Sequence, residues 1–64
     1  MTIGEIIRNR RKELNMTQED LIRKSGVSRP TISTIESGVH DGNIRTIMRI
    51  FNALGLELSV RRKK

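Results

Sequence analysis

Residues 17–38 constrain the fold most, because they place two helix starts and two glycine stops close together. Thr17 can cap a first helix, and Asp20 lies three residues later, where its carboxylate can complete a capping box. Gly26 follows and can adopt the left-handed conformation that ends many helices. This spacing predicts a short helix over about residues 18–25.

A second helix is predicted directly afterwards. Ser28 can act as its N-cap, and Pro30 falls in its first turn, where the missing proline N–H costs nothing. Gly38 is placed to end this helix, which should cover about residues 29–37. Two short helices joined by a glycine turn form a helix-turn-helix.

The side chains of the second helix indicate what it could contact. Ile32 and Ile35 are three residues apart and can face one core. The remaining positions carry mostly hydroxyl groups and one guanidinium: Ser28, Arg29, Thr31, Ser33 and Thr34. Arginine pairs well with guanine, and serine and threonine bind bases or phosphates, so this face suits DNA. The alternative is an ordinary solvated face, because these residue types are also common on protein surfaces.

Two further helices are predicted on either side of this pair. Thr2 can cap the first, with Glu5 completing a capping box, and the helix should end near Leu14 with Asn15 as a left-handed cap. Its apolar face comprises Ile3, Ile6, Ile7 and Leu14. The last helix begins after Asn43 and ends at Gly55. It is the most apolar of the chain and the expected centre of the core, with the stripe Ile44, Ile47, Met48, Ile50, Phe51 and Leu54.

The hydrophobic period changes after Gly55. Leu56, Leu58 and Val60 alternate with polar residues, which is the two-residue period of a strand. A lone strand needs a ladder partner, and the simplest is the same strand of a second copy, antiparallel about a two-fold axis. The alternatives are a frayed tail and a short fifth helix that packs Leu56 and Leu58 on the core. The expected organisation is a helical domain over 1–55, a dimerisation strand over 56–61 and a basic tail over 62–64.

Composition limits the classes of function. The chain has 64 residues and no cysteine, so a disulfide framework and thiolate metal sites are excluded. A cytoplasmic location is expected, because no apolar run approaches the length of a membrane span and the N-terminus lacks a secretory apolar region. The formal charge of +6, from 13 basic and 7 acidic residues, favours nucleic acid first and an anionic membrane second. The charges are spread along the chain, which argues against the membrane. Phe51 is the single aromatic residue, which argues against base-stacking platforms for single strands.

An enzyme is not expected from this sequence. The single histidine, His40, lies in a predicted loop with no partners for catalysis or for a metal ion. The carboxylates are not clustered in an apolar setting, so neither a catalytic site nor a cofactor is predicted.

The chain resembles the phage repressor and Cro type of helix-turn-helix protein, also called the Xre family. The resemblance covers Thr2 to about Leu56 and rests on four spaced motifs: Thr17-Gln18-Glu19-Asp20-Leu21, Gly26-Val27-Ser28-Arg29, Ile32-Ser33-Thr34-Ile35-Glu36-Ser37-Gly38 and Ala53-Leu54-Gly55. It implies an all-α, lambda-repressor-like domain of four to five helices that binds double-stranded DNA as a homodimer.

The resemblance also implies roles for single residues. Gln18 matches a phosphate and base-edge contact, and Ser28, Arg29 and Thr34 match positions that read bases in the major groove. Thr17 and Thr31 match anchors on the DNA backbone, and Ser33 belongs to the same polar face. Arg11 and Glu36 match a partly buried ion pair between the first and third helices, which would set the recognition helix against the rest of the domain.

Three features depart from the family pattern. Ile22 stands where a small alanine is usual, which could open the angle between the motif helices. Pro30 replaces a serine or threonine, so one DNA contact is lost. The loop over 39–42 lacks the basic and proline residues often found there, which weakens the case for phosphate contacts from that loop.

The tail over residues 54–62 is similar to that of the HipB-type antitoxins, in which a terminal strand pairs across the dimer and the protein also holds a kinase toxin. Two functions are therefore expected as alternatives. One is a homodimeric repressor that reads a palindromic operator. The other is an antitoxin that neutralises a toxin partner while repressing its own operon.

Overall fold

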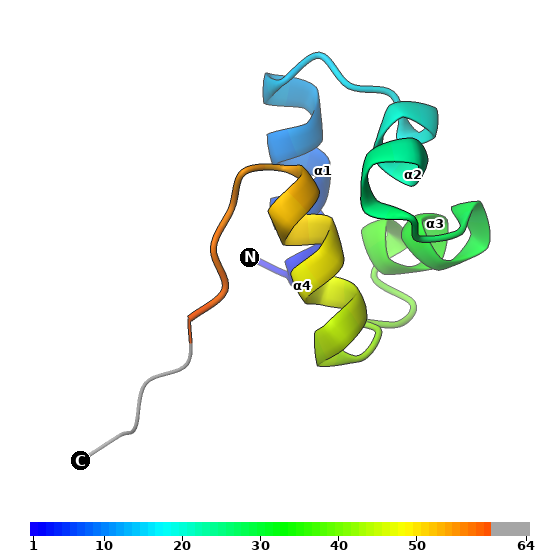
Figure 1. Cartoon of the computed structure of the whole chain (residues 1–64). Coiled ribbons are helices and arrows are strands. Elements are labelled where there is room, and N and C mark those ends of the chain that lie inside the picture. Colours follow the sequence, from blue (N-terminus) through cyan, green and yellow to red (C-terminus); the bar gives the residue numbers. More distant parts are fainter. Residues whose placement is uncertain (60–64) are drawn as a thin grey trace.

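The part of the chain that the structure describes contains four helices joined by short loops. The computed structural model describes residues 1–59 and contains α1 (Ile3–Glu13), α2 (Gln18–Ser25), α3 (Arg29–Ser37) and α4 (Ile44–Ala53) (Figure 1). Helix α3 packs against α1 and α2, and α4 packs against α2. The prediction of an all-α, four-helix domain is confirmed, and α2 and α3 have the predicted bounds.

Local sequence signals set the lengths of α2 and α3. The predicted capping box is present: Thr17 Oγ1 accepts a hydrogen bond from the Asp20 N–H at 3.0 Å, and Asp20 Oδ2 accepts one from the Thr17 N–H at 2.9 Å. Gly26 (φ 72°) and Gly38 (φ 83°) adopt the left-handed conformation at the ends of α2 and α3. A residue with a Cβ would be strained at both positions.

The capping box predicted at Thr2 is only half formed. The Glu5 N–H donates to Thr2 Oγ1 at 3.1 Å, but the Glu5 carboxylate accepts from the Thr2 hydroxyl at 3.2 Å instead of from the Thr2 backbone. At the other end of α1, Asn15 has a φ of 55°, as predicted for a left-handed cap.

The core is aliphatic apart from one phenylalanine. Its buried side chains come from all four helices and the turns beside them: Ile7, Leu21, Val27, Ile32, Ile35, Ile47, Ile50, Phe51 and Leu54. Within residues 1–59 no polar or charged residue belongs to this buried set. Since α3 contributes two of these side chains, the core fixes which face of α3 remains outside.

Three apolar residues that were predicted to face the core are exposed, so this part of the prediction was wrong. Leu14 is 40% exposed because α1 ends at Glu13 and Leu14 only caps it. Ile44 and Met48 are 60% and 53% exposed. They lie four residues apart along the edge of the α4 stripe, on a strip that no other helix of the described chain covers.

The segment after α4 forms neither a helix nor a strand over residues 56–59. Leu56 and Leu58 are half-buried and pack on the core, so the alternative of a short fifth helix is wrong for these residues although their packing on the core is observed. Pairing across a two-fold axis requires a second copy, and the strand over 56–61 therefore stays a prediction. Val60 and the basic tail over 62–64 lie outside the described residues.

Helices α1 and α3 approach each other closely at Gly4. A Cβ placed on this residue would lie 2.1 Å from the Ile35 carbonyl oxygen and 3.1 Å from Glu36 Cα. Since the nearest neighbours are backbone atoms, no side chain can rotate away to make space. The close contact brings the first turn of α1 against the last turns of α3.

Gly4→Ala is therefore expected to lower the free energy of unfolding by about 1–3 kcal/mol, the usual cost of overpacking. In an unobstructed helix interior the same change would be stabilising by about 0.5–1 kcal/mol. Urea unfolding of this variant and of the control Asn9→Ala, an exposed residue of α1, measures the difference. A Gly4→Ala protein at least as stable as the wild type would contradict the close packing of α1 on α3.

Candidate nucleic-acid interface

Helix α3 buries one face and presents the other to solvent. Ile32 and Ile35 are 0% and 1% exposed. On the outer side Ser33 is exposed and Thr34 is partly exposed. The remaining polar residues of the predicted site, which are Ser28, Arg29 and Thr31, lie at the N-terminal end of α3, where Ser28 and Arg29 are exposed and Thr31 is partly exposed. The hydroxyl groups and the guanidinium are thus accessible, as contact with DNA requires.

The hydroxyl groups of α3 are already oriented by hydrogen bonds. Ser28 is the N-cap residue by backbone conformation, but it makes no side-chain cap bond; its hydroxyl pairs with the Thr31 hydroxyl at 2.9 Å. The Thr34 hydroxyl donates to the Pro30 carbonyl at 2.6 Å. Because this bond uses its only proton, the Thr34 oxygen can only accept from a ligand, which suits the amino groups of adenine and cytosine.

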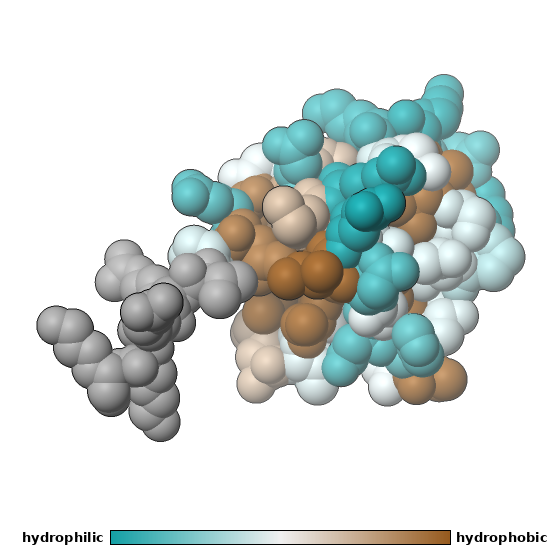
Figure 2. Space-filling view, turned by 60° about the horizontal axis from the view of Figure 1, so that its bottom comes forward, coloured by the Kyte–Doolittle hydropathy of each residue, from teal (hydrophilic) through white to brown (hydrophobic). Residues whose placement is uncertain are grey.

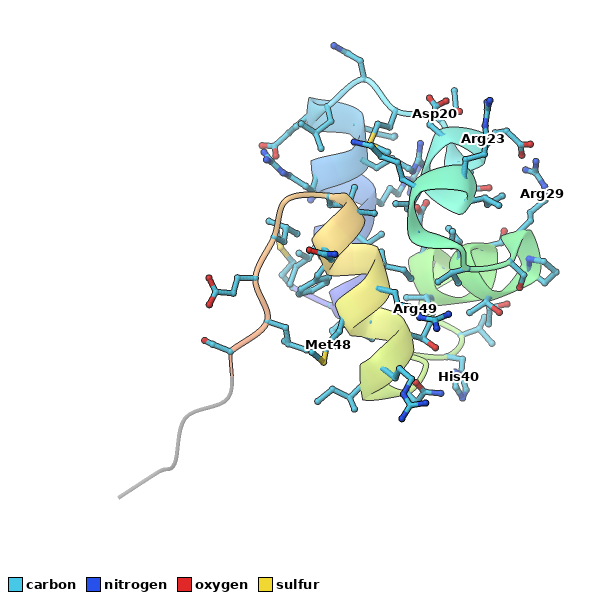
Figure 3. All side chains as sticks on the ribbon, in the orientation of Figure 1. Asp20, Arg23, Arg29, His40, Met48 and Arg49 are labelled. Atoms are coloured by element: carbon cyan, nitrogen blue, oxygen red, sulfur yellow. The ribbon has the colours of Figure 1, made fainter. Side chains whose placement is uncertain are left out.

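The Arg29 side chain is held by the Glu19 carboxylate, which was not among the predicted site residues. Arg29 Nη2 donates to Glu19 Oε2 across the two motif helices, and the two side chains remain 58% and 52% exposed. Figure 3 shows Arg29 on the outer side of α2 and α3, with Arg23 and Asp20 above it on α2. The ten-residue separation of Glu19 and Arg29 matches no helix or strand period, so no local pattern predicts this pair.

A partly buried ion pair joins α3 to α1, as predicted from the sequence. Arg11 binds Glu36 through two parallel hydrogen bonds, Nε to Oε2 at 2.9 Å and Nη2 to Oε1 at 3.1 Å. The Arg11 Nη1 donates to the Met16 carbonyl at 2.8 Å, and the two charged side chains are 12% and 5% exposed. The Gln18 amide donates to the same Glu36 carboxylate at 3.3 Å, which joins α2 to the network.

The start of α2 lies close to this network. The pKa of Asp20 is lowered below its ordinary value of 3.8. The largest cause is the hydrogen bond that the Asp20 carboxylate accepts from the Thr17 backbone N–H, and the second is a hydrogen bond with the Thr17 side chain. Asp20 therefore stays ionised at the N-terminus of α2, where negative charge is favourable. The Thr17 hydroxyl also accepts a hydrogen bond from the Asp20 N–H, so the capping box holds this side chain at the start of α2.

His40 lies in the loop between α3 and α4. His40 is exposed, and its Nδ1 accepts a hydrogen bond from the Gly42 N–H at 2.8 Å, which orders the loop. Residues 1–59 contain no group of three His, Cys, Asp or Glu side chains placed to hold a metal ion. None of the four described helices is both long and apolar enough to span a bilayer.

Comparison with known proteins relates the chain to regulators of transcription. Residues 7–60 match the family model described as Helix-turn-helix, HTH_3. An uncharacterised HTH-type transcriptional regulator of Methanothermobacter thermautotrophicus is 44% identical over 52 residues, which are 81% of this chain and 75% of that protein. The immunity repressor protein of Bacillus phage phi105 is 34% identical over 59 residues, 92% of this chain and 41% of the repressor. No solved structure gave a significant match.

The family match covers most of the chain, including both motif helices and the ion pair that fixes them. A protein of this family acts by binding DNA and not as an enzyme. The chain therefore belongs to the Xre family of helix-turn-helix DNA-binding regulators.

Proposed function

We propose that this protein is a homodimeric transcriptional repressor that reads a palindromic operator in the major groove. The observation that carries the proposal is the outer face of α3, where Arg29, Ser33 and Thr34 are accessible while Ile32 and Ile35 anchor the helix in the core. The similarity to the phage phi105 immunity repressor favours repression as the regulatory outcome. Such a regulator acts where the genome lies, in agreement with the cytoplasmic location expected from the sequence.

The contacts divide into those that read bases and those that position the protein. Arg29, Ser28, Ser33 and Thr34 are proposed to face base edges, and the orientation of the Thr34 hydroxyl restricts it to donors on the base. Thr17 and Thr31 are the proposed anchors on the DNA backbone, and Gln18 is proposed to contact a phosphate and a base edge. The Gln18 amide nitrogen has two protons, so one N–H can remain bonded to Glu36 while the other donates to DNA, and one side chain then links the DNA contact to the ion pair.

Selection of bound sequences from a random pool of duplex DNA tests this proposal. Two copies related by a two-fold axis would place their α3 helices about 34–36 Å apart, one helical turn of DNA. The selected site should therefore be an inverted repeat with half-site centres about 10 base pairs apart and a guanine at one position in each half. A pool that shows no enrichment would exclude sequence-specific reading.

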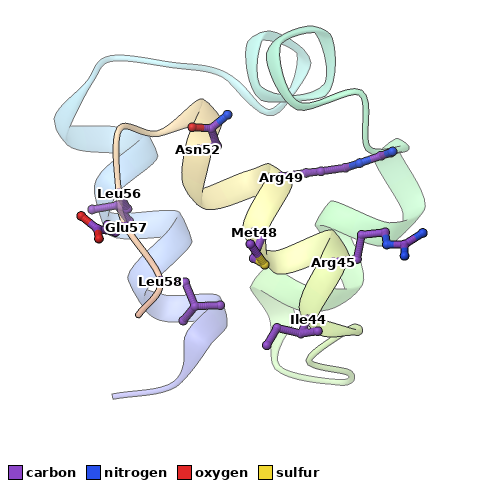
Figure 4. Close-up of a pocket in the computed structure, with 8 residues that line it drawn as sticks. All are labelled: Ile44, Arg45, Met48, Arg49, Asn52, Leu56, Glu57 and Leu58. Carbon is purple, nitrogen blue, oxygen red and sulfur yellow. The ribbon is translucent and has the colours of Figure 1, made fainter. Parts of the chain in front are cut away.

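The surface proposed for dimerisation is a groove beside α4 that has apolar walls and is also lined by Arg45, Arg49, Asn52 and Glu57. Ile44 and Met48 form one wall and Leu56 and Leu58 the other, around a volume of about 610 Å³ (Figure 4). Figure 2 shows apolar side chains gathered in one patch on a face of the domain. Leu56, Glu57 and Leu58 of the proposed strand border the groove, so a second copy could cover the groove and the strand at once. The position of Leu56 and Leu58 supports the proposed homodimer, in which Val60, outside the described residues, is expected from the sequence to take part.

Met48→Lys is expected to weaken the dimer without unfolding the chain, because Met48 is already 53% exposed and a charge in a dry interface is costly. Asn9→Lys adds the same charge at an exposed position of α1 outside the groove and serves as the control. Sedimentation velocity over a range of concentrations should show Met48→Lys shifted to monomer by tenfold or more in Kd, about 1.4 kcal/mol. An unshifted equilibrium would place the dimer interface elsewhere.

The groove also favours a second candidate function, that of an antitoxin. An exposed apolar surface next to a tail similar to that of HipB-type antitoxins could be covered by a toxin protein instead of a second copy. Co-expression with the product of the neighbouring gene distinguishes the two. Co-purification that is lost in Met48→Lys but kept in Asn9→Lys would support the antitoxin function. If no partner co-purifies with the wild type, the antitoxin function is refuted and the repressor function remains.

A further inference from the structure

The Glu19–Arg29 pair places a negative charge beside the one guanidinium on the reading helix. Glu19 stands in the first turn of α2, Arg29 at the first position of α3, and both are more than half exposed. The neighbouring carboxylate, Asp20, is engaged in the capping box, so Glu19 is the acidic side chain of α2 that binds Arg29. Any ligand that binds Arg29 therefore also lies close to the negative charge of Glu19.

The geometry of the Arg29 guanidinium determines which DNA groups can bind it while Glu19 remains bound. Nη2 carries two protons, one on each of the two edges with which a guanidinium can make paired hydrogen bonds. A single bond from Nη2 to Glu19 uses one of these edges and leaves the other complete. The O6 and N7 atoms of guanine, which are neutral acceptors, can occupy the free edge while Glu19 keeps the first.

A phosphate group that binds the free edge of Arg29 differs from guanine because it carries a negative charge. Its charge is repelled by the Glu19 carboxylate at a distance of a few ångströms, where two unit charges in water interact by more than the thermal energy. Non-specific complexes depend on phosphate contacts and cannot use guanine at a fixed position. The pair should thus oppose non-specific binding and leave the specific complex nearly unchanged.

We propose that Glu19 is a specificity-determining residue, which orients Arg29 for a guanine edge and denies it to phosphates on unrelated DNA. The inference rests on the proposed function, in which Arg29 reads a base. Glu19 contacts Arg29 and acts through it, so it is a positioning residue. It raises the ratio of specific to non-specific affinity and not the affinity itself.

Glu19→Gln tests this proposal against Glu13→Gln, which removes the same charge from an exposed position of α1 that pairs with Arg10. Binding of both variants and the wild type is measured by fluorescence anisotropy on the selected operator and on a scrambled duplex of the same length, at several salt concentrations. Relative to Glu13→Gln, Glu19→Gln should bind the scrambled duplex about fivefold more tightly per protomer. The slope of log K against log salt should steepen by about 0.9 for each phosphate newly bound by Arg29.

Operator affinity should change by less than twofold relative to the control, so that the specificity ratio falls. In an Arg29→Ala background the difference between Glu19→Gln and Glu13→Gln should disappear, which a purely structural role of Glu19 would not produce. Equal specificity ratios and equal salt slopes for the two variants would overturn the proposal while operator binding by the wild type still supported the proposed function. Failure of the wild type to bind any duplex would instead refute the proposed function.

Discussion

Glu36→Gln is expected to lower the free energy of unfolding by about 3 kcal/mol, toward the lower end of the 3–5 kcal/mol typical of a broken buried pair. Arg11 and Glu36 are 12% and 5% exposed, so the guanidinium that remains has little access to water. It keeps its bond to the Met16 carbonyl, and the new amide can replace one of the lost bonds, which limits the cost. A domain of this size has a total stability of only about 3–10 kcal/mol, so the loss is large.

Thermal unfolding followed by circular dichroism measures this effect, with an expected decrease in Tm of at least about 12 °C. Glu13→Gln is the control, because its exposed pair with Arg10 should contribute about 0–1 kcal/mol. The double variant Arg11→Met, Glu36→Met removes both charges together and should be more stable than Glu36→Gln, since no unpaired buried charge remains. A Glu36→Gln protein that melts with the control would show that the ion pair does not fix α3.

Arg29→Ala is expected to reduce affinity for the selected operator by about 30-fold or more. One bidentate contact with guanine contributes about 1–3 kcal/mol, and a dimer would lose two of them, about 2–6 kcal/mol. Affinity for scrambled duplex should fall much less, because Glu19 restrains Arg29 from phosphates in that complex. Specificity should relax at a single base position in each half-site, which competition with single-base variants of the operator would reveal.

Two variants separate the role of the guanidinium from that of its charge. Arg29→Lys keeps the charge but lacks the planar pair of donors, so it should recover little of the lost affinity. Arg8→Ala removes a charge from an exposed position of α1 and should weaken operator and scrambled duplex by similar factors. If Arg29→Ala behaved like Arg8→Ala, Arg29 would be a general source of positive charge and not a base contact.

The features that could be predicted from sequence are those determined by neighbours in the chain. The capping box at Thr17 and the left-handed glycines at positions 26 and 38 allowed the bounds of α2 and α3 to be predicted to the exact residue. Helix caps depend on residues within three or four positions of the helix end. The inward placement of Ile32 and Ile35 follows from helical spacing in the same way. The accessible polar face of α3 is then a geometric consequence.

The features that could not be predicted depend on how separate helices meet. The exposure of Ile44 and Met48 is decided by which strip of α4 another helix covers, since the whole stripe is apolar. The close approach at Gly4 and the Glu19–Arg29 pair join residues from different helices, with no period in the sequence to indicate them. The hydrogen bond from the Gln18 amide to the Glu36 carboxylate also joins two helices, and it was not predicted for the same reason.

The central claim is that the outer face of α3 enters the major groove while the α4 groove stays away from DNA. Titration of ¹⁵N-labelled protein with the selected operator duplex, followed by amide chemical shifts, tests it most directly. The account predicts the largest shift changes at the start of α2 and over Ser28 to Thr34, with small changes at Ile44, Met48 and Leu56. Changes concentrated on α4 and the residues after it, with α3 unaffected, would contradict it.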